Sequence, residues 1–316
     1  LIIILLFFLS RLPFFAFTIA AAFLIIAIDL ITIGDRNVIQ DTQLNKITKL
    51  SNYNKVTSSG EEYDLAIIAT PPYNHIESYE KIYNKCNRVL IEKPITNDLN
   101  WIFGSELKEH LGKNRVFESL MYFHHPIWKE VKNLVQSGDI KKINTEFSVP
   151  HLPKGSHRYS KKYGGGSLND QGLYPISLVS ELIMNTYEIK DIKVFSENNY
   201  EVDLSGQFKI ILDNNIEAKG SWGLGKDYKN FINLVDKDGK EYEINFIFSK
   251  PDETDTKIIL KDQNVSKDIN IGIYDQFQIM YLDAINNDLS KFNYSSYKNL
   301  IKRYEIYKKI SDEIKF

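Results

Sequence analysis

The chain has 316 residues, of which 25% are charged, and its formal net charge is −2. This length is sufficient for two domains that each bury a hydrophobic core, and the near balance of charge excludes a partner recognised by overall charge, such as nucleic acid or an anionic membrane surface. The single cysteine, Cys86, cannot form an internal disulfide, and no second thiol is available for a structural zinc site. We therefore expect no metal and a reducing compartment, the cytoplasm.

The first 28 residues are unusually apolar, since their only polar side chains are Ser10, Arg11 and Thr18. The run from 12 to 28 is at the short edge of what can cross a hydrocarbon core of about 30 Å. Three interpretations of this stretch remain open. The first is a membrane anchor formed by residues 1–28, and the second is a degenerate nucleotide-binding loop. The third is a sequence foreign to the native protein, such as a frame-shifted translation restored near Asp29.

Three short apolar runs then end in chain breakers: LITIGDRN (30–37), DLAIIATPP (64–72) and RVLIEKP (88–94). Such runs are typical of strands buried on both faces of a parallel sheet. Between the second and third runs, apolar residues of segment 73–86 recur at helical spacing and predict one crossover helix. A strand, a helix and a strand with short connections form a βαβ unit, so the first 120 residues are expected to be doubly wound.

The second half has a different pattern. A helix is expected over 126–138, followed by strand-like segments at 143–149, 206–213, 216–223, 230–236, 240–248 and 256–262, with turn signals between them. The tail from Tyr274 to Phe316 returns to helical periodicity. We therefore predict an α/β protein with a doubly wound Rossmann domain at 1–120 and an α+β domain at 121–316 that contains a large, mostly antiparallel sheet.

Two segments contain candidate chemistry. Glu92 and Lys93 end an apolar strand, and ligands of open α/β sheets bind outside the carboxyl ends of the strands. Asp170 and Tyr174 follow three consecutive glycines and lie four residues apart, which places both on one face of a helix and makes them a possible proton-handling pair. The alternatives are two solvated strand-end charges and an ordinary amphipathic helix that buries Tyr174 in the core.

Together, these motifs resemble a family. The segments DLAIIATPPYNH, RVLIEKP, VFESLMYFHHPIWKEVKNLVQSGDI and GGGSLNDQGLYPI occur in the order and spacing of the glucose-fructose oxidoreductase, inositol dehydrogenase and rhizopine catabolism (Gfo/Idh/MocA) family. The resemblance extends from about Asp35 to at least Ile176. The segment from Glu118 to Pro126 and the tyrosine at position 174 are most similar to the branch containing dihydrodiol dehydrogenases and glucose-fructose oxidoreductase.

The resemblance implies roles for individual residues. Lys93 matches the catalytic lysine, Asp170 the substrate-orienting carboxylate and Tyr174 the acid/base group. The implied substrate-binding set is Lys93, Arg158, Asp170 and Tyr174, and the implied dinucleotide-binding set is Asp35, Arg36, Thr70, Pro71, Asn74, His75, Glu92 and Lys93. Asp35 would accept a hydrogen bond from the adenosine ribose, which favours NAD over NADP, whereas Arg36 could contact a 2′-phosphate.

The chemistry of these residues fits the implied reaction. Oxidation of a secondary alcohol removes the hydroxyl proton while a hydride leaves the same carbon. An ammonium about 4 Å from a phenol is worth roughly 4 kcal/mol at an effective dielectric of about 20. We therefore expect Lys93 to lower the pKa of Tyr174 toward neutrality, so that Tyr174 serves as the base.

The opening stretch departs from the family pattern, which has a G-x-G-x-x-G turn for the pyrophosphate. Phe8, Ser10 and Pro13 stand where the glycines belong. We predict that Leu1 to Phe7 form the central strand of the parallel sheet, that 14–25 form the helix after it, and that the loop between them binds dinucleotide poorly.

The function expected from the resemblance is hydride transfer between NAD or NADP and a sugar, sugar derivative or polyol. A non-catalytic relative that acts as a binding or assembly module is the alternative. Expected partners are a small sugar-like molecule and further copies of the chain, as a dimer or tetramer, with no nucleic acid and no membrane.

Overall fold

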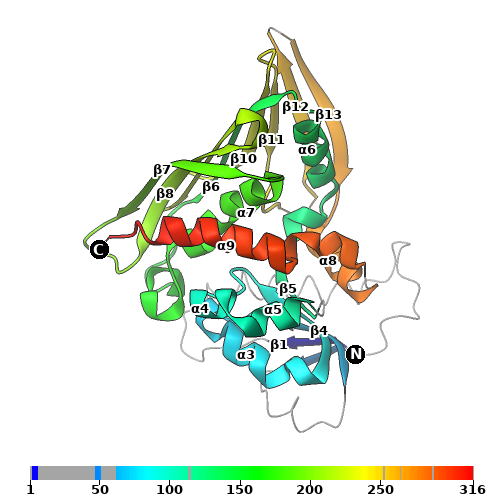
Figure 1. Cartoon of the computed structure of the whole chain (residues 1–316), viewed down its shortest axis with the longest axis vertical. Helices are drawn as coiled ribbons and strands as arrows, with labels where there is room; N and C mark the ends of the chain where they lie inside the picture. Colours follow the sequence, from blue (N-terminus) through cyan, green and yellow to red (C-terminus); the bar gives the residue numbers. More distant parts are fainter. Residues whose placement is uncertain are drawn as a thin grey trace.

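The computed structural model describes residues 2–5, 47–50, 62–112, 115–251, 253–263, 265–286 and 288–315. Figure 1 shows two sheets stacked along the long axis of the molecule, with helix α9 (Tyr297–Ser311) running between them. The parallel sheet and the large, mostly antiparallel sheet confirm the predicted fold class. The predicted boundary at residue 120 stays a prediction.

In the smaller sheet the strand order is β2-β1-β3-β4-β5, and every described pair is parallel. Its strands are β1 (Ile2–Leu5), β2 (Ile47–Leu50), β3 (Tyr63–Ile68), β4 (Cys86–Glu92) and β5 (Val116–Ser119). The apolar runs of β3 and β4 are buried almost completely, as expected for strands covered on both faces.

The opening residues form part of this sheet. Ile2–Leu5 pair with β2 on one side and β3 on the other, so the predicted strand is confirmed, although β3 is the middle one of the five described strands. The predicted helix at 14–25, the loop at 8–13, Asp35 and Arg36 lie outside the described residues. Among the described residues, no helix is both long and apolar enough to cross a membrane. The apolar run from 12 to 28 lies outside the described residues.

The crossover between β3 and β4 is shorter than predicted. Instead of one helix over 73–86, the chain forms a 3-10 turn at Pro72–Asn74, helix α3 at His75–Ile82 and a second 3-10 turn at Tyr83–Lys85. Cys86 is the first residue of β4 and is buried. The helical spacing of segment 73–86 included Cys86 in the predicted helix. Strand β4 in fact begins at Cys86, two residues before the apolar run RVLIEKP that predicted this strand.

The larger sheet has the order β13-β12-β11-β10-β6-β9-β8-β7, and its pairs are antiparallel except for the parallel pair β6–β9. Its strands are β6 (Ile140–Val149), β7 (Tyr187–Ser196), β8 (Asp203–Leu212), β9 (Ile216–Leu224), β10 (Lys229–Asp236), β11 (Glu241–Asn245), β12 (Asp255–Asp262) and β13 (Val265–Ile273). The sequence predicted six of these strands and missed the two edge strands, β7 and β13, in which no residue is fully buried.

The remaining α-helices cover the sheets or connect them. They are α4 (Leu99–Phe103), α5 (Ser105–Gly112), α6 (Pro126–Gln136), α7 (Leu173–Leu182) and α8 (Gln276–Ile285). With α8 and α9, the helical tail predicted from Tyr274 onward is confirmed. Because α9 contacts α7 as well as α4 and α5, the end of the chain packs against both halves of the molecule.

A buried ion pair joins α9 to the parallel sheet. Glu118 of β5 and Arg303 of α9 are both fully buried and bonded to each other. The same carboxylate accepts from the Tyr304 hydroxyl at 2.8 Å and from the Ile95 backbone N–H at 2.9 Å. Glu118 therefore ties the C-terminal helix to the loop that directly follows Lys93.

We predict that Arg303→Met destabilises the protein strongly, because it leaves the Glu118 carboxylate buried without its cation. Breaking one side of a buried pair costs about 3–5 kcal/mol. Urea unfolding of the variant and of the unaltered chain measures this loss.

Lys308→Met provides the matched control on the same helix. Lys308 pairs with Asp312 at 2.8 Å, but the two side chains are 49% and 60% exposed. Such a surface pair is worth less than about 1 kcal/mol. Equal losses of stability in the two variants would contradict the structural role given to the buried pair.

Candidate active site

The Lys93 side chain leaves the carboxyl end of β4 and reaches the second half of the molecule. Its ammonium donates to the main-chain carbonyl of Asp170 at 2.6 Å and to the Asp170 carboxylate at 2.9 Å. Its side chain is only 12% exposed. The structure therefore brings together two predicted site residues that lie 77 positions apart in the chain.

The Asp170 carboxylate is shared among several donors. Arg158 donates from Nε at 2.5 Å, and the amide of Gln171 donates at 2.7 Å. Burial alone would raise the pKa of Asp170, but the charges of Arg158 and Lys93 outweigh it and hold that pKa well below its ordinary value. Asp170 is thus a fixed anion between two cations, and Arg158 lies where the resemblance expects it.

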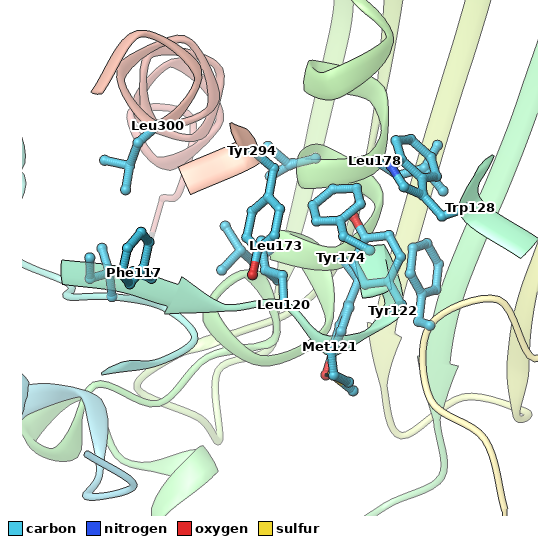
Figure 2. Packing of buried hydrophobic residues seen from close by; sticks show 14 of the residues in the cluster. Phe117, Leu120, Met121, Tyr122, Trp128, Leu173, Tyr174, Leu178, Tyr294 and Leu300 are labelled. Carbon is cyan, nitrogen blue, oxygen red and sulfur yellow. The ribbon is translucent and has the colours of Figure 1, made fainter. Parts of the chain in front are cut away.

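Tyr174 lies beneath the lysine. The Lys93 ammonium is 4.7 Å from the centroid of the Tyr174 ring, on its face, while the hydroxyl points to the sulfur of Met121 at 4.0 Å. Figure 2 shows this ring packed within the buried cluster that includes Met121 and Tyr122. The predicted pair is therefore close in space, in a cation–π arrangement.

The expected effect of Lys93 on Tyr174 is wrong in this structure. Burial, followed by the nearby charges of Glu92 and Asp170, raises the pKa of Tyr174 well above its ordinary value. Lys93 does not offset this effect, because its charge lies over the ring face while the hydroxyl points to the Met121 sulfur. Tyr174 is accordingly a neutral phenol here and cannot be assigned as a resting base.

The glycine turn before Asp170 is tightly packed. A β-carbon at Gly166, whose φ is +112°, would lie 2.5 Å from the Asp203 carboxylate, and one at Gly165 would lie 2.5 Å from the Arg158 carbonyl. The Asp203 carboxylate also accepts from the Ser167 hydroxyl at 2.5 Å and from the Leu168 N–H at 2.7 Å. These contacts fix the start of the helix that presents Asp170.

Sequence reasoning missed Asp203, which is 4% exposed and lies at the first position of β8. Burial raises its pKa, although the hydrogen bonds from Ser167 and Leu168 oppose that change. The sequence analysis included Glu118 only as part of a family motif and did not predict its contacts with α9. A single buried carboxylate has no spacing signal in a sequence, because its partners lie far along the chain.

The loop after β3 lies beside the loop after β4, because Ile68 pairs with Ile91 at the ends of these parallel strands. His75 joins the two loops. Its fully buried ring lies between the carbonyl oxygens of Thr70, at 2.6 Å, and Pro94, at 2.8 Å. Burial lowers the pKa of His75 despite these two acceptors.

The other residues expected to contact the dinucleotide lie near this junction. Thr70 is buried, Pro71 and Asn74 are partly exposed, and Asn74 donates its N–H to the Pro71 carbonyl at 2.9 Å. Burial raises the pKa of Glu92 to about 7, while the adjacent Lys93 opposes the rise. These loops supply backbone and side-chain polar groups at the carboxyl edge of the sheet, where a dinucleotide binds in open α/β folds.

No group of three or more His, Cys, Asp or Glu residues suited to a metal ion occurs within the ranges that the structure describes.

The sequence matches known proteins over much of its length. Residues 27–117 match the Gfo/Idh/MocA model, which is described as an oxidoreductase family with an NAD-binding Rossmann fold. A dTDP-3,4-didehydro-2,6-dideoxy-alpha-D-glucose 3-reductase from Actinomadura kijaniata is 23% identical over 223 residues, or 69% of this chain and 66% of the relative. The enzyme of the same name from Saccharopolyspora spinosa is 25% identical over 221 residues, or 68% and 65%. The matched part thus spans about two thirds of these curated relatives.

Solved structures share the fold. KijD10, a 3-ketoreductase from Actinomadura kijaniata in complex with NADP and TDP-benzene, superposes with a TM-score of 0.73 at 19% identity over 84% of this chain and 82% of that one. An aldose-aldose oxidoreductase from Caulobacter crescentus complexed with glycerol gives a TM-score of 0.74 at 14% identity over 99% and 97%. The motifs, the two-sheet fold and the match over residues 27–117 agree in the similarity of this chain to the Gfo/Idh/MocA family of oxidoreductases.

Proposed function

We propose that the protein is an NAD(P)-dependent oxidoreductase that transfers a hydride between the nicotinamide and a hydroxyl or carbonyl carbon of a sugar derivative. The observation that carries this proposal is the contact of Lys93 with Asp170 and Tyr174 at the carboxyl edge of the parallel sheet. The names of the curated relatives, which are 3-reductases of a dTDP-linked keto sugar, support a sugar derivative as the substrate.

The dinucleotide supplies or accepts the hydride when it is bound. In our proposal, the loops that contain Thr70 and Lys93 hold its nicotinamide half, because they adjoin at the ends of β3 and β4. The residues of the glycine-loop position lie outside the described ranges.

The protonation states favour reduction. The Lys93 ammonium and the neutral Tyr174 phenol are both proton donors. The ammonium lies over the face of the phenol ring, so both donors belong to one site. Lys93 would donate a hydrogen bond to the carbonyl oxygen of a keto sugar and stabilise the alkoxide that develops as the hydride arrives. Tyr174 would supply the proton after its hydroxyl turns from Met121. Asp170 keeps the ammonium in place and orients Arg158 beside it.

The alternative is a relative that binds a sugar or a partner without hydride transfer. The observation favouring it is the presence of Phe8, Ser10 and Pro13 where the family has glycines, together with a family match that begins only at residue 27. Titration with NADH and NADPH decides between the two. Micromolar binding supports the oxidoreductase, whereas no binding until residues 8, 10 and 13 are all changed to glycine supports the alternative for the chain as it stands.

Lys93→Met and Tyr174→Phe are each expected to lower turnover by about 10² or more, because each removes a proton or hydrogen-bond donor to the developing alkoxide. The double variant is expected to lose much less than the product of the two losses, since the groups act together. Steady-state rates with NADH or NADPH and a keto sugar measure these effects. Lys129→Met, an exposed lysine of α6, is the control, and near-normal rates in either site variant would refute the assignment.

The cofactor preference is a separate prediction. Asp35 favours NADH if its carboxylate accepts from the ribose 2′-hydroxyl, because the same charge repels a 2′-phosphate. Asp35→Ala is expected to reduce the ratio of NADH to NADPH affinity by about tenfold, measured by fluorescence titration of both cofactors. Tighter binding of NADPH to the unaltered chain would overturn the preference and assign the phosphate contact to Arg36.

A further inference from the structure

The contacts that hold the Arg158 guanidinium use only one of its three nitrogens. Its Nε donates to Oδ2 of Asp170 at 2.5 Å, while Lys93 donates to Oδ1 at 2.9 Å. Oδ2 also accepts from the Gln171 amide at 2.7 Å. Both carboxylate oxygens are thus engaged, and the two terminal nitrogens of Arg158 have no hydrogen-bond partner among the described residues. Their N–H groups, which form a rigid fork, remain available to a ligand.

Arg158 lies at the solvent end of the candidate site. The exposed fraction of the side chain rises from 12% at Lys93 through 21% at Asp170 to 37% at Arg158. Tyr174, under the lysine, is buried. A substrate whose reacting carbon lies at Lys93 would therefore extend past Arg158 on its way to solvent.

The segment that contains Arg158 is strongly basic, although the net charge of the chain is −2. Between residues 147 and 169 it has four lysine or arginine residues and no aspartate or glutamate. Lys154 and Lys162 of this segment are exposed. Glu201 reaches the segment from outside, but it accepts from the backbone N–H of Lys161 at 2.9 Å. A cluster of cations with so few carboxylates beside it favours an anionic ligand.

We propose that the substrate is a sugar that carries a phosphate group, and that the terminal nitrogens of Arg158 bind this phosphate. The planar fork of arginine matches two oxygens of a phosphate. Lys93 and Arg158 bond to the two oxygens of one carboxylate, so one sugar ring can place a carbonyl at Lys93 and a phosphate at Arg158. The phosphate belongs either to a sugar monophosphate or to a nucleoside diphosphate sugar. This inference rests on the proposed function, because it names the substrate class of the same site.

Titration calorimetry of the full chain tests the proposal, with reduced cofactor present to fill the dinucleotide site. The probes are dTDP, α-glucose 1-phosphate and thymidine. We expect both phosphate-bearing probes to bind at least tenfold more tightly than thymidine. Tighter binding of dTDP than of glucose 1-phosphate would assign the phosphate to a nucleoside diphosphate, and the reverse order would assign it to a sugar monophosphate. Thymidine that binds as tightly as dTDP would overturn the proposal.

Arg158→Gln is expected to weaken the binding of dTDP and glucose 1-phosphate by about tenfold or more, because it removes charged hydrogen bonds to the phosphate. Arg158→Lys keeps the charge without the fork and is expected to restore only part of the affinity. Lys129→Met, on α6, is the control and should leave both affinities unchanged. If the glutamine variant does not fold, the lysine variant provides the comparison. Unchanged affinity in a folded variant at 158 would overturn the proposal.

Kinetics separate this inference from the proposed function. In the unaltered chain, a phosphate-bearing keto sugar should have a kcat/KM at least tenfold above that of its phosphate-free counterpart, and Arg158→Gln should remove most of this difference. Equal kcat/KM values for the two sugars would leave an oxidoreductase but overturn the phosphate site. Phosphate binding that depends on Arg158, in a chain without hydride transfer, would support the site and contradict the proposed function.

Discussion

The contact between Lys93 and Asp170 is the interaction on which the candidate site depends. It joins the end of a strand of the parallel sheet to the helix that packs on the large sheet, and both of its hydrogen bonds end on one residue. The hydrogen bonds of Glu118 help to hold the chain beside Lys93 in place. The N–H of Ile95, two positions after Lys93, donates to the same buried carboxylate that pairs with Arg303. Without these anchors, a long and flexible lysine would lose the position that makes it useful.

The electrostatics of the site follow from burial and from the placement of charge. Asp170 remains an anion because two cations face it, whereas Tyr174 remains neutral because its surroundings are apolar and its nearest charges include carboxylates. The cation lies over the tyrosine ring and not beside its hydroxyl. A site with an ammonium and a neutral phenol is arranged to donate protons, which agrees with the reductase names of the curated relatives.

The sequence was informative wherever a pattern repeats over several residues. Short apolar runs predicted β3 and β4, and turn residues predicted six strands of the large sheet, because burial and chain reversal leave local signals. The edge strands β7 and β13 were missed; no residue of either strand is fully buried, although apolar and polar residues alternate along much of β7.

The sequence predicted which residues form the candidate site better than it predicted how they are oriented. Motifs placed Lys93, Arg158, Asp170 and Tyr174 together, and the structure brings them into contact. The direction of the Tyr174 hydroxyl and the roles of Asp203 and Arg303 depend on contacts between distant segments, which no local spacing encodes.

The most direct test of the account is isotope transfer. NADPH or NADH carrying deuterium at C4 of the nicotinamide is incubated with the protein and a dTDP-linked 3-keto sugar, and the product is analysed by mass spectrometry. The account predicts deuterium on the new carbinol carbon, with transfer strongly reduced by Lys93→Met and retained by Lys129→Met. Absence of transfer from both labelled cofactors, in a folded chain that binds them, would contradict it.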